Sequence, residues 1–144
     1  MRLPENKKKI LISIDPGSAK SGIAVVNYDK TVIERKVIPS GDLEEALKRY
    51  IELFSPDVII IGDGTSSRKI KLLLEECTKN MPLITVNEKF TTEKARMRYF
   101  KENPPRGFWK LIPVTLQVPK VPVDDLAAVI MAEEYIDGEG TLPE

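Results

Sequence analysis

Histidine is absent from the 144 residues of this chain, and cysteine occurs once, at Cys77. Without histidine, the commonest general base, the usual zinc ligand and every serine–histidine or cysteine–histidine catalytic pair are excluded. A single cysteine forms no internal disulfide, which favours a reducing compartment. If the chain is an enzyme, its carboxylates, its lysines or a bound metal must therefore carry the chemistry.

Net charge and long apolar runs are missing as well. The 22 basic and 22 acidic residues cancel, although a neutral total does not exclude a local basic face. No stretch approaches the roughly 20 apolar residues that span a bilayer, and the apolar run at 10–14 is too short for a signal peptide. We expect a cytoplasmic protein without membrane contacts, folded as one domain over residues 1–144 with frayed tails at 1–8 and 138–144.

Hydrophobic periodicity divides the chain into strands and helices. It predicts strands at 9–15, 21–28, 31–38, 57–62 and 82–88, and helices at 40–54, 66–80, 91–103 and 123–136. Three consecutive strands followed by alternating helices and strands predict an α/β fold. Its mixed five-stranded sheet is a three-strand meander continued by βα units, with helices on both faces.

Carboxylates follow three of the predicted strands. Asp15 ends the first strand, Asp63 follows the fourth, and Glu88 ends the fifth. Ligands of open α/β sheets bind outside the carboxyl ends of parallel strands, so these acids are predicted to share one edge if the three strands are parallel. Asp124 and Asp125 begin the last helix, whose N-terminus would dock beside them.

Several acids at one edge repel one another unless a cation lies among them. Mg²⁺ and Mn²⁺ prefer such carboxylate oxygens, and two of these ions about 3.5–4 Å apart cleave phosphodiesters without histidine. Each acid except Glu88 also has a structural explanation. Asp15 before Pro-Gly and Asp63 between glycines are typical turn residues, and Asp124 or Asp125 suits a helix N-cap. Glu88 has no evident structural role.

The chain resembles the YqgF (RuvX) group of RuvC-like nucleases, within the ribonuclease H-like superfamily. The resemblance is carried, in order from residue 9 to about residue 137, by SIDPGSAKSGIAV, VNEKFTTEKAR and VDDLAAVIMAEEYI. The segment IGDGTSSR is also similar to the corresponding turn in the YqgF-like domain of the Tex transcription accessory proteins.

This resemblance implies a ribonuclease H-like fold and an acidic catalytic site. The matching positions are Asp15, Glu88 and Asp124, which would hold Mg²⁺ or Mn²⁺ with Asp125 as a fourth ligand. Many members have an aspartate where this chain has Asn87 and an arginine where it has Lys89. These two differences concern the strength or the specificity of substrate binding. ATPases of the actin and sugar-kinase type share the superfamily, but they need two facing domains, and this chain has the length of one.

Basic residues concentrate after Glu88. Lys94, Arg98 and Lys101 recur at spacings of four and three and therefore share a helical face. Together with Lys89, and with Arg68 at the start of the second predicted helix, they are candidate contacts to a phosphate backbone. The alternative is an ordinary solvated face.

Residues 103–122 hold five of the eleven prolines, together with Phe108 and Trp109. We expect the two aromatic side chains to pack onto the sheet as a lid. The alternative is that one of them stacks on an exposed base or wedges into a junction.

These observations predict a metal-dependent endonuclease that hydrolyses phosphodiester bonds in structured nucleic acid. The resemblance implies either processing of the small-subunit ribosomal RNA precursor or Holliday-junction resolution, and the sequence does not choose between RNA and branched DNA. The second hypothesis is a catalytically silent nucleic-acid-binding or scaffold domain of the same fold. Junction resolution needs two active sites, so monomer and homodimer both stay open.

Overall fold

The computed structural model describes residues 9–64, 67–79, 81–87, 91–119 and 121–138. Its strands are β1 (Ile10–Asp15), β2 (Lys20–Asn27), β3 (Val32–Pro39), β4 (Val58–Gly62) and β5 (Leu83–Val86). Its α-helices are α1 (Leu43–Phe54), α2 (Ser67–Glu75), α3 (Thr91–Glu102) and α4 (Asp124–Ile136). Short 3₁₀ turns lie at Ser40–Asp42, Gly107–Leu111 and Val114–Leu116.

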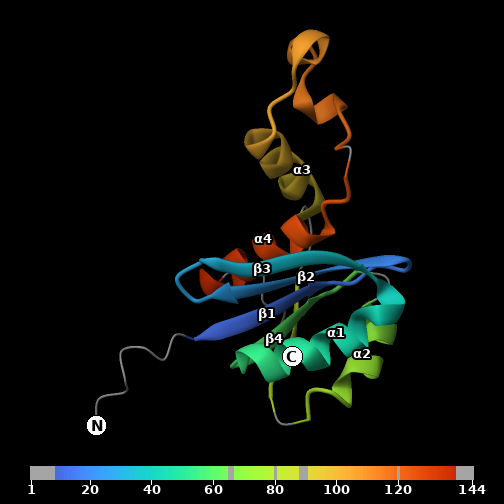
Figure 1. The fold of residues 1–144 in the computed structure, drawn as a ribbon, viewed down its shortest axis with the longest axis vertical. Coiled ribbons are helices and arrows are strands. Elements are labelled where there is room, and N and C mark those ends of the chain that lie inside the picture. The colour runs from blue at the N-terminus through green and yellow to red at the C-terminus, as the bar shows by residue number, and fades with distance from the viewer. Residues whose placement is uncertain (1–8, 65–66, 80, 88–90, 120, 139–144) are drawn as a thin grey trace.

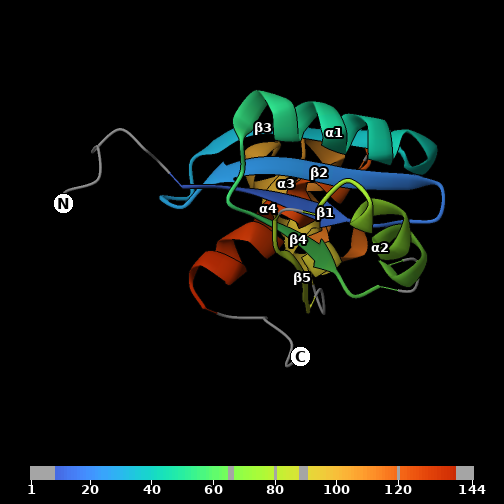
Figure 2. The same cartoon turned by 90° about the horizontal axis from the view of Figure 1, so that it is seen from below.

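The sheet has five strands in the spatial order β3-β2-β1-β4-β5, seen from top to bottom in Figure 2. Strands β1, β2 and β3 form the antiparallel meander, whereas β4 and β5 continue the sheet parallel to β1. Strand β1 is central because its apolar residues are covered on both faces, as is typical of strands with continuous apolar runs. The predicted α/β fold with a mixed five-stranded sheet is confirmed.

Helices cover both faces of the sheet, as predicted. Helices α1 and α2 lie on one face, over Ile12, Ile14 and their neighbours, and α4 lies on the other, over Leu11 and Ile60 (Figure 1). Helix α4 is apolar on nearly all sides because it is enclosed between the sheet and α3. None of the helices in the described part of the chain has the length and apolar character needed to cross a membrane.

The segment between α3 and α4 projects away from the sheet (Figure 1), and we call residues 103–122 the arm. The expected lid is wrong: Phe108 is 70% exposed and Trp109 is 56% exposed. The reason is the order of the layers. Helix α3 packs on the outer side of α4, so the chain that leaves α3 starts one helix layer away from the sheet.

Candidate active site at the carboxyl edge of the sheet

Asp15 lies at the carboxyl end of β1, where it pairs in register with Gly22 of β2. Side chains alternate along a strand, and Leu11 belongs to the core under α4, so Asp15, four residues on, is on the α4 face. Ser13, between them on that face, is fully buried and its Oγ has no hydrogen-bond partner among the described residues.

Hydrogen bonds fix the turn that follows Asp15. The Gly17 amide donates to Ser21 Oγ at 3.2 Å, and Ser40 Oγ donates to the Gly17 carbonyl at 2.6 Å. The two serine hydroxyls are 2.7 Å apart. The turn is thus held to β2 and to the end of β3, which gives the partly buried Asp15 a defined backbone position.

Gly22 is where the last helix meets the sheet. A Cβ atom added to Gly22 would lie 2.0 Å from the Asp124 carbonyl oxygen and 2.7 Å from the Asp125 amide nitrogen. The backbone at the start of α4 therefore rests directly on the strand position that pairs with Asp15. The backbone of Asp124 thus lies next to the strand position that pairs with Asp15, although the two residues are far apart in the sequence.

Asp124 has a pKa that its surroundings shift upward. Partial burial raises the pKa of its carboxyl above the usual value, its own backbone amide counteracts this, and the neighbouring Asp125 charge raises it further. Lys20 at the start of β2 is near enough to lower that pKa. Helix α4 begins without a side-chain cap, and its N-cap is Val123, so the expectation that Asp124 or Asp125 is the N-cap is wrong.

In metal-free buffer at pH 7, Asp124→Asn is expected to melt at or above the wild-type temperature. The folded-state pKa is raised, so wild-type stability falls as pH rises from the unfolded value of 3.8 through the folded one. Thermal melts in EDTA should therefore show the advantage at pH 7 and none below pH 3.8. A lower melting temperature at pH 7 would show instead that the charge at the helix N-terminus is net stabilising.

Asp125 is engaged by neighbouring groups. Its Oδ1 accepts a hydrogen bond from the Leu126 amide at 2.9 Å, and its Oδ2 lies 3.6 Å from Arg35 Nε of β3. Arg35 Nη2 also lies 3.7 Å from Glu102 Oε2, at the end of α3. Arg35 therefore joins β3, the start of α4 and the end of α3, and these contacts indicate a positioning role for Asp125.

Of the other two acids predicted at this edge, the structure describes Asp63 but not Glu88. Asp63 directly follows β4 and is exposed, and Asn87 directly follows β5, so the parallel strands do deliver both positions to the edge that holds Asp15. Glu88 and Lys89 lie outside the described residues. Within the described ranges, no three acidic side chains are grouped closely enough to hold a metal ion by themselves.

The predicted basic face of α3 makes contacts within the protein. Lys94 Nζ pairs with Glu134 of α4, and Arg98 Nη1 donates to Glu133 Oε1 at 2.7 Å. Lys101 is exposed at the end of α3 that Arg35 connects to Asp125, and Arg68 is exposed in the first turn of α2. The two groups thus differ: Lys94 and Arg98 fasten α3 to α4, whereas Lys101 and Arg68 face solvent.

We expect Arg98→Ala to lower the free energy of unfolding by about 1 kcal/mol, because the variant removes a charged hydrogen bond that is only partly exposed. Lys101→Ala is the matched control on the same helix and should leave stability unchanged. Urea denaturation measures both variants, and fluorescence anisotropy with a labelled oligonucleotide measures their binding. If Arg98→Ala weakens oligonucleotide binding and leaves stability unchanged, Arg98 contacts the nucleic acid directly.

Comparisons with known proteins give a structural likeness without a sequence match. No protein-family model matches the chain, and no curated protein matches it. Two solved structures of Thermus thermophilus RuvC are similar at 13% sequence identity. One, in complex with a Holliday junction substrate, has a TM-score of 0.53 and covers 90% of this chain and 94% of its own. The other has a TM-score of 0.54, with 92% and 98% covered.

The chain has a ribonuclease H-like fold. At this identity the likeness concerns the fold alone, and it spans nearly the whole of each chain.

Three residues of this ribonuclease H-like fold were missed by sequence reasoning. Gly22 carries a recognisable signal, because a glycine inside a strand pattern indicates close approach of another backbone. Arg35 and Lys20 carry no such signal: each is a charged residue on a strand, and only the packing of α4 against β2 and β3 brings them near Asp125 and Asp124.

Proposed function

We propose that this protein is a divalent-metal-dependent nuclease that hydrolyses phosphodiester bonds in structured nucleic acid. The observation that carries the proposal is the contact at Gly22, which brings the start of α4 with Asp124 onto the strand position paired with Asp15. Two carboxylates from opposite ends of the chain then share the edge at which α/β sheets bind their ligands.

The donor chemistry at this edge fits Mg²⁺ or Mn²⁺. Asp15 and Asp124 offer hard carboxylate oxygens, and burial penalises the charge on Asp124, a penalty that a nearby cation would relieve. Glu88 is proposed as the third ligand on its sequence position, and Asp125 as a fourth or as a positioning residue. When bound, a divalent cation supplies Lewis acidity toward water and toward a phosphoryl oxygen.

The protein's own residues would hold the substrate and the geometry. Lys20 lies beside Asp124, Arg68 is exposed in the first turn of α2, and Lys101 is exposed at the end of α3. All three are proposed as contacts to phosphates. Arg35, through Asp125, would keep the first turn of α4 in place against the strands. Lys89 belongs to the proposed surface on its sequence position alone.

Two substrates are supported by different observations. RuvC, whose fold this chain shares, has been solved with a Holliday junction, which supports branched DNA. The resemblance of the sequence motifs to the YqgF group supports a ribosomal RNA precursor. A junction requires two cuts and hence a homodimer, whereas an RNA end can be trimmed by a monomer.

The test is a cleavage assay with purified protein on a four-way DNA junction, a small-subunit ribosomal RNA precursor and a linear duplex, each with Mg²⁺, with Mn²⁺ and with EDTA. We expect one structured substrate to be cut in the presence of metal, and none in EDTA. Binding without cleavage under every condition would reject the nuclease and favour the second candidate, a nucleic-acid-binding domain without catalytic activity.

A further inference from the structure

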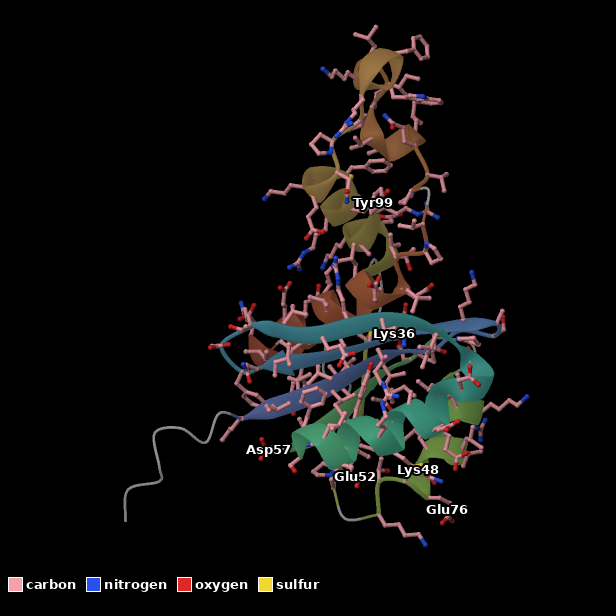
Figure 3. All side chains as sticks on the ribbon, viewed as in Figure 1. Lys36, Lys48, Glu52, Asp57, Glu76 and Tyr99 are labelled. Carbon is pink, nitrogen blue, oxygen red and sulfur yellow. The ribbon has the colours of Figure 1, made fainter. Side chains whose placement is uncertain are left out.

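The arm exposes an unusual concentration of apolar surface. Single exposed apolar side chains are ordinary, whereas many of them in one short segment indicate a contact site. Six large apolar side chains of the arm are between 52% and 81% exposed: Phe108, Trp109, Leu111, Leu116, Val118 and Val121. Figure 3 shows side chains projecting from the arm on several sides, beyond the labelled Tyr99 at its base. The exposed apolar side chains therefore indicate that the arm contacts a partner.

The charge of the arm indicates an anionic partner. The whole chain is neutral, but the sequence from 103 to 123 contains Arg106, Lys110 and Lys120 and no acidic residue. Two copies of such a segment would bring like charges together, whereas a nucleic acid would meet complementary charge. Charge complementarity thus favours a nucleic acid over a second copy of this chain.

A cavity of about 530 Å³ lies between the end of α3 and the arm, a size within the range of about 300–1,000 Å³ that is usual for small-molecule sites. Its walls combine flat apolar groups, including Tyr99, Phe100 and Trp109, with the polar side chains of Arg106 and Gln117. Such walls suit a planar, partly polar group such as a nucleobase.

Backbone hydrogen bonds and the side chain of Gln117 hold the tip of the arm in shape. Gln117 Nε2 donates to the Trp109 carbonyl at 3.0 Å and to the Ile112 carbonyl at 2.8 Å. Phe108 and Trp109 meet edge to face, with ring centroids 6.0 Å apart. The aromatic rings therefore belong to a structured turn, so less conformational freedom is lost when a base stacks on them.

We propose that the arm binds unpaired bases of a nucleic acid, with Trp109 as the stacking platform and Arg106 and Lys110 as phosphate contacts. The proposal rests on the proposed function and deepens it, because it requires a substrate with unstacked bases. The arm leaves α3 at Glu102, which Arg35 joins to Asp125, so the base of the arm is connected to the first turn of α4.

Trp109 is the only tryptophan of the chain, so its fluorescence reports on the arm directly. The wild-type protein in EDTA is titrated with a single-stranded oligonucleotide and, separately, with the same strand fully paired in a duplex. We expect the single strand to quench Trp109 emission and the duplex to leave it nearly unchanged. Equal quenching by both, or quenching by neither, would overturn the assignment.

Variants separate stacking from mere exposure. Trp109→Ala should weaken binding of a labelled single strand by about 5- to 150-fold in anisotropy measurements, and Trp109→Phe should retain most of the affinity. Leu72→Ala is the matched control, because Leu72 is 64% exposed but lies on α2. Unchanged melting temperatures would show that the variants fold. Equal affinities for Trp109→Ala and wild type would reject the stacking platform.

A second copy of the chain as the occupant has its own signature. Sedimentation would show self-association that Trp109→Ala abolishes, and Trp109 emission would follow protein concentration instead of added nucleic acid; this result would overturn the proposal. The cleavage assay keeps the two proposals apart. Metal-dependent cleavage with unchanged emission rejects only the arm, whereas quenching by single strands without cleavage rejects only the nuclease.

Discussion

Asp15→Asn is expected to abolish metal-dependent cleavage while the protein still folds. Asparagine has nearly the same size as aspartate, so the turn held by Gly17, Ser21 and Ser40 should persist. The substitution removes the carboxylate charge that would hold the cation. Metal stabilisation of several kcal/mol in the transition state corresponds to a loss of roughly 10³-fold in rate. Single-turnover cleavage with saturating Mg²⁺ or Mn²⁺ measures this loss, and thermal melts check the fold.

The matched control is an aspartate at the opposite edge of the same sheet. Asp57 precedes β4, and its Oδ2 accepts a hydrogen bond from the Ile10 amide at 3.0 Å. An asparagine there keeps an acceptor oxygen, so Asp57→Asn should cleave at the wild-type rate. A threefold lower rate corresponds to a rise of well under about 1.4 kcal/mol in activation free energy. If Asp15→Asn cleaves within about threefold of the wild-type rate, the carboxyl edge is not the active site.

Gly22→Ala is expected to lower the free energy of unfolding by about 3 kcal/mol, at the upper end of the usual cost of overpacking. The new methyl group would lie 2.0 Å from the Asp124 carbonyl oxygen and 2.2 Å from its carbonyl carbon. Both are backbone atoms, which cannot rotate aside, so α4 must move away from β2. Because that movement separates Asp124 from Asp15, cleavage should also fall, by about 100-fold for a displacement near 1 Å. Urea denaturation and the cleavage assay measure the two effects.

Gly41→Ala provides the control for this experiment. A Cβ atom at Gly41 meets nothing within 4 Å, so alanine there should be neutral or slightly stabilising. Equal stability of Gly22→Ala and Gly41→Ala would show that α4 does not depend on close contact with β2. Lost stability with full cleavage would show that the position of Asp124 is not critical.

The fold could be predicted from local apolar patterns because these patterns indicate which faces of each strand and helix are buried. The continuous apolar runs of β1 and β4 indicated strands buried on both sides, and each has a neighbouring strand on either side in the sheet. The alternation of helices and strands after β3 required parallel neighbours, which delivers Asp15, Asp63 and Asn87 to one edge. Sequence also marked the start of the last helix at Asp124.

The surroundings of these residues did not follow from the sequence, because periodicity records that a face is covered and not what covers it. Lys94 and Arg98 share a helical face with Lys101, and nothing local states that α4 presents Glu134 and Glu133 to the first two. The same holds for Phe108 and Trp109, whose distance from the sheet depends on the layer in which α3 packs.

The sequence by itself determined the strands, the helices, their order and the acidic residues at the strand and helix ends. Only the tertiary structure decided that Gly22 seats the start of α4 beside Asp15, and that Arg35 binds Asp125. The physical reason is the range of the interactions. Strand and helix patterns come from neighbours within a few residues, whereas these contacts join segments that are distant in the chain and meet only when the α4 core closes over the sheet.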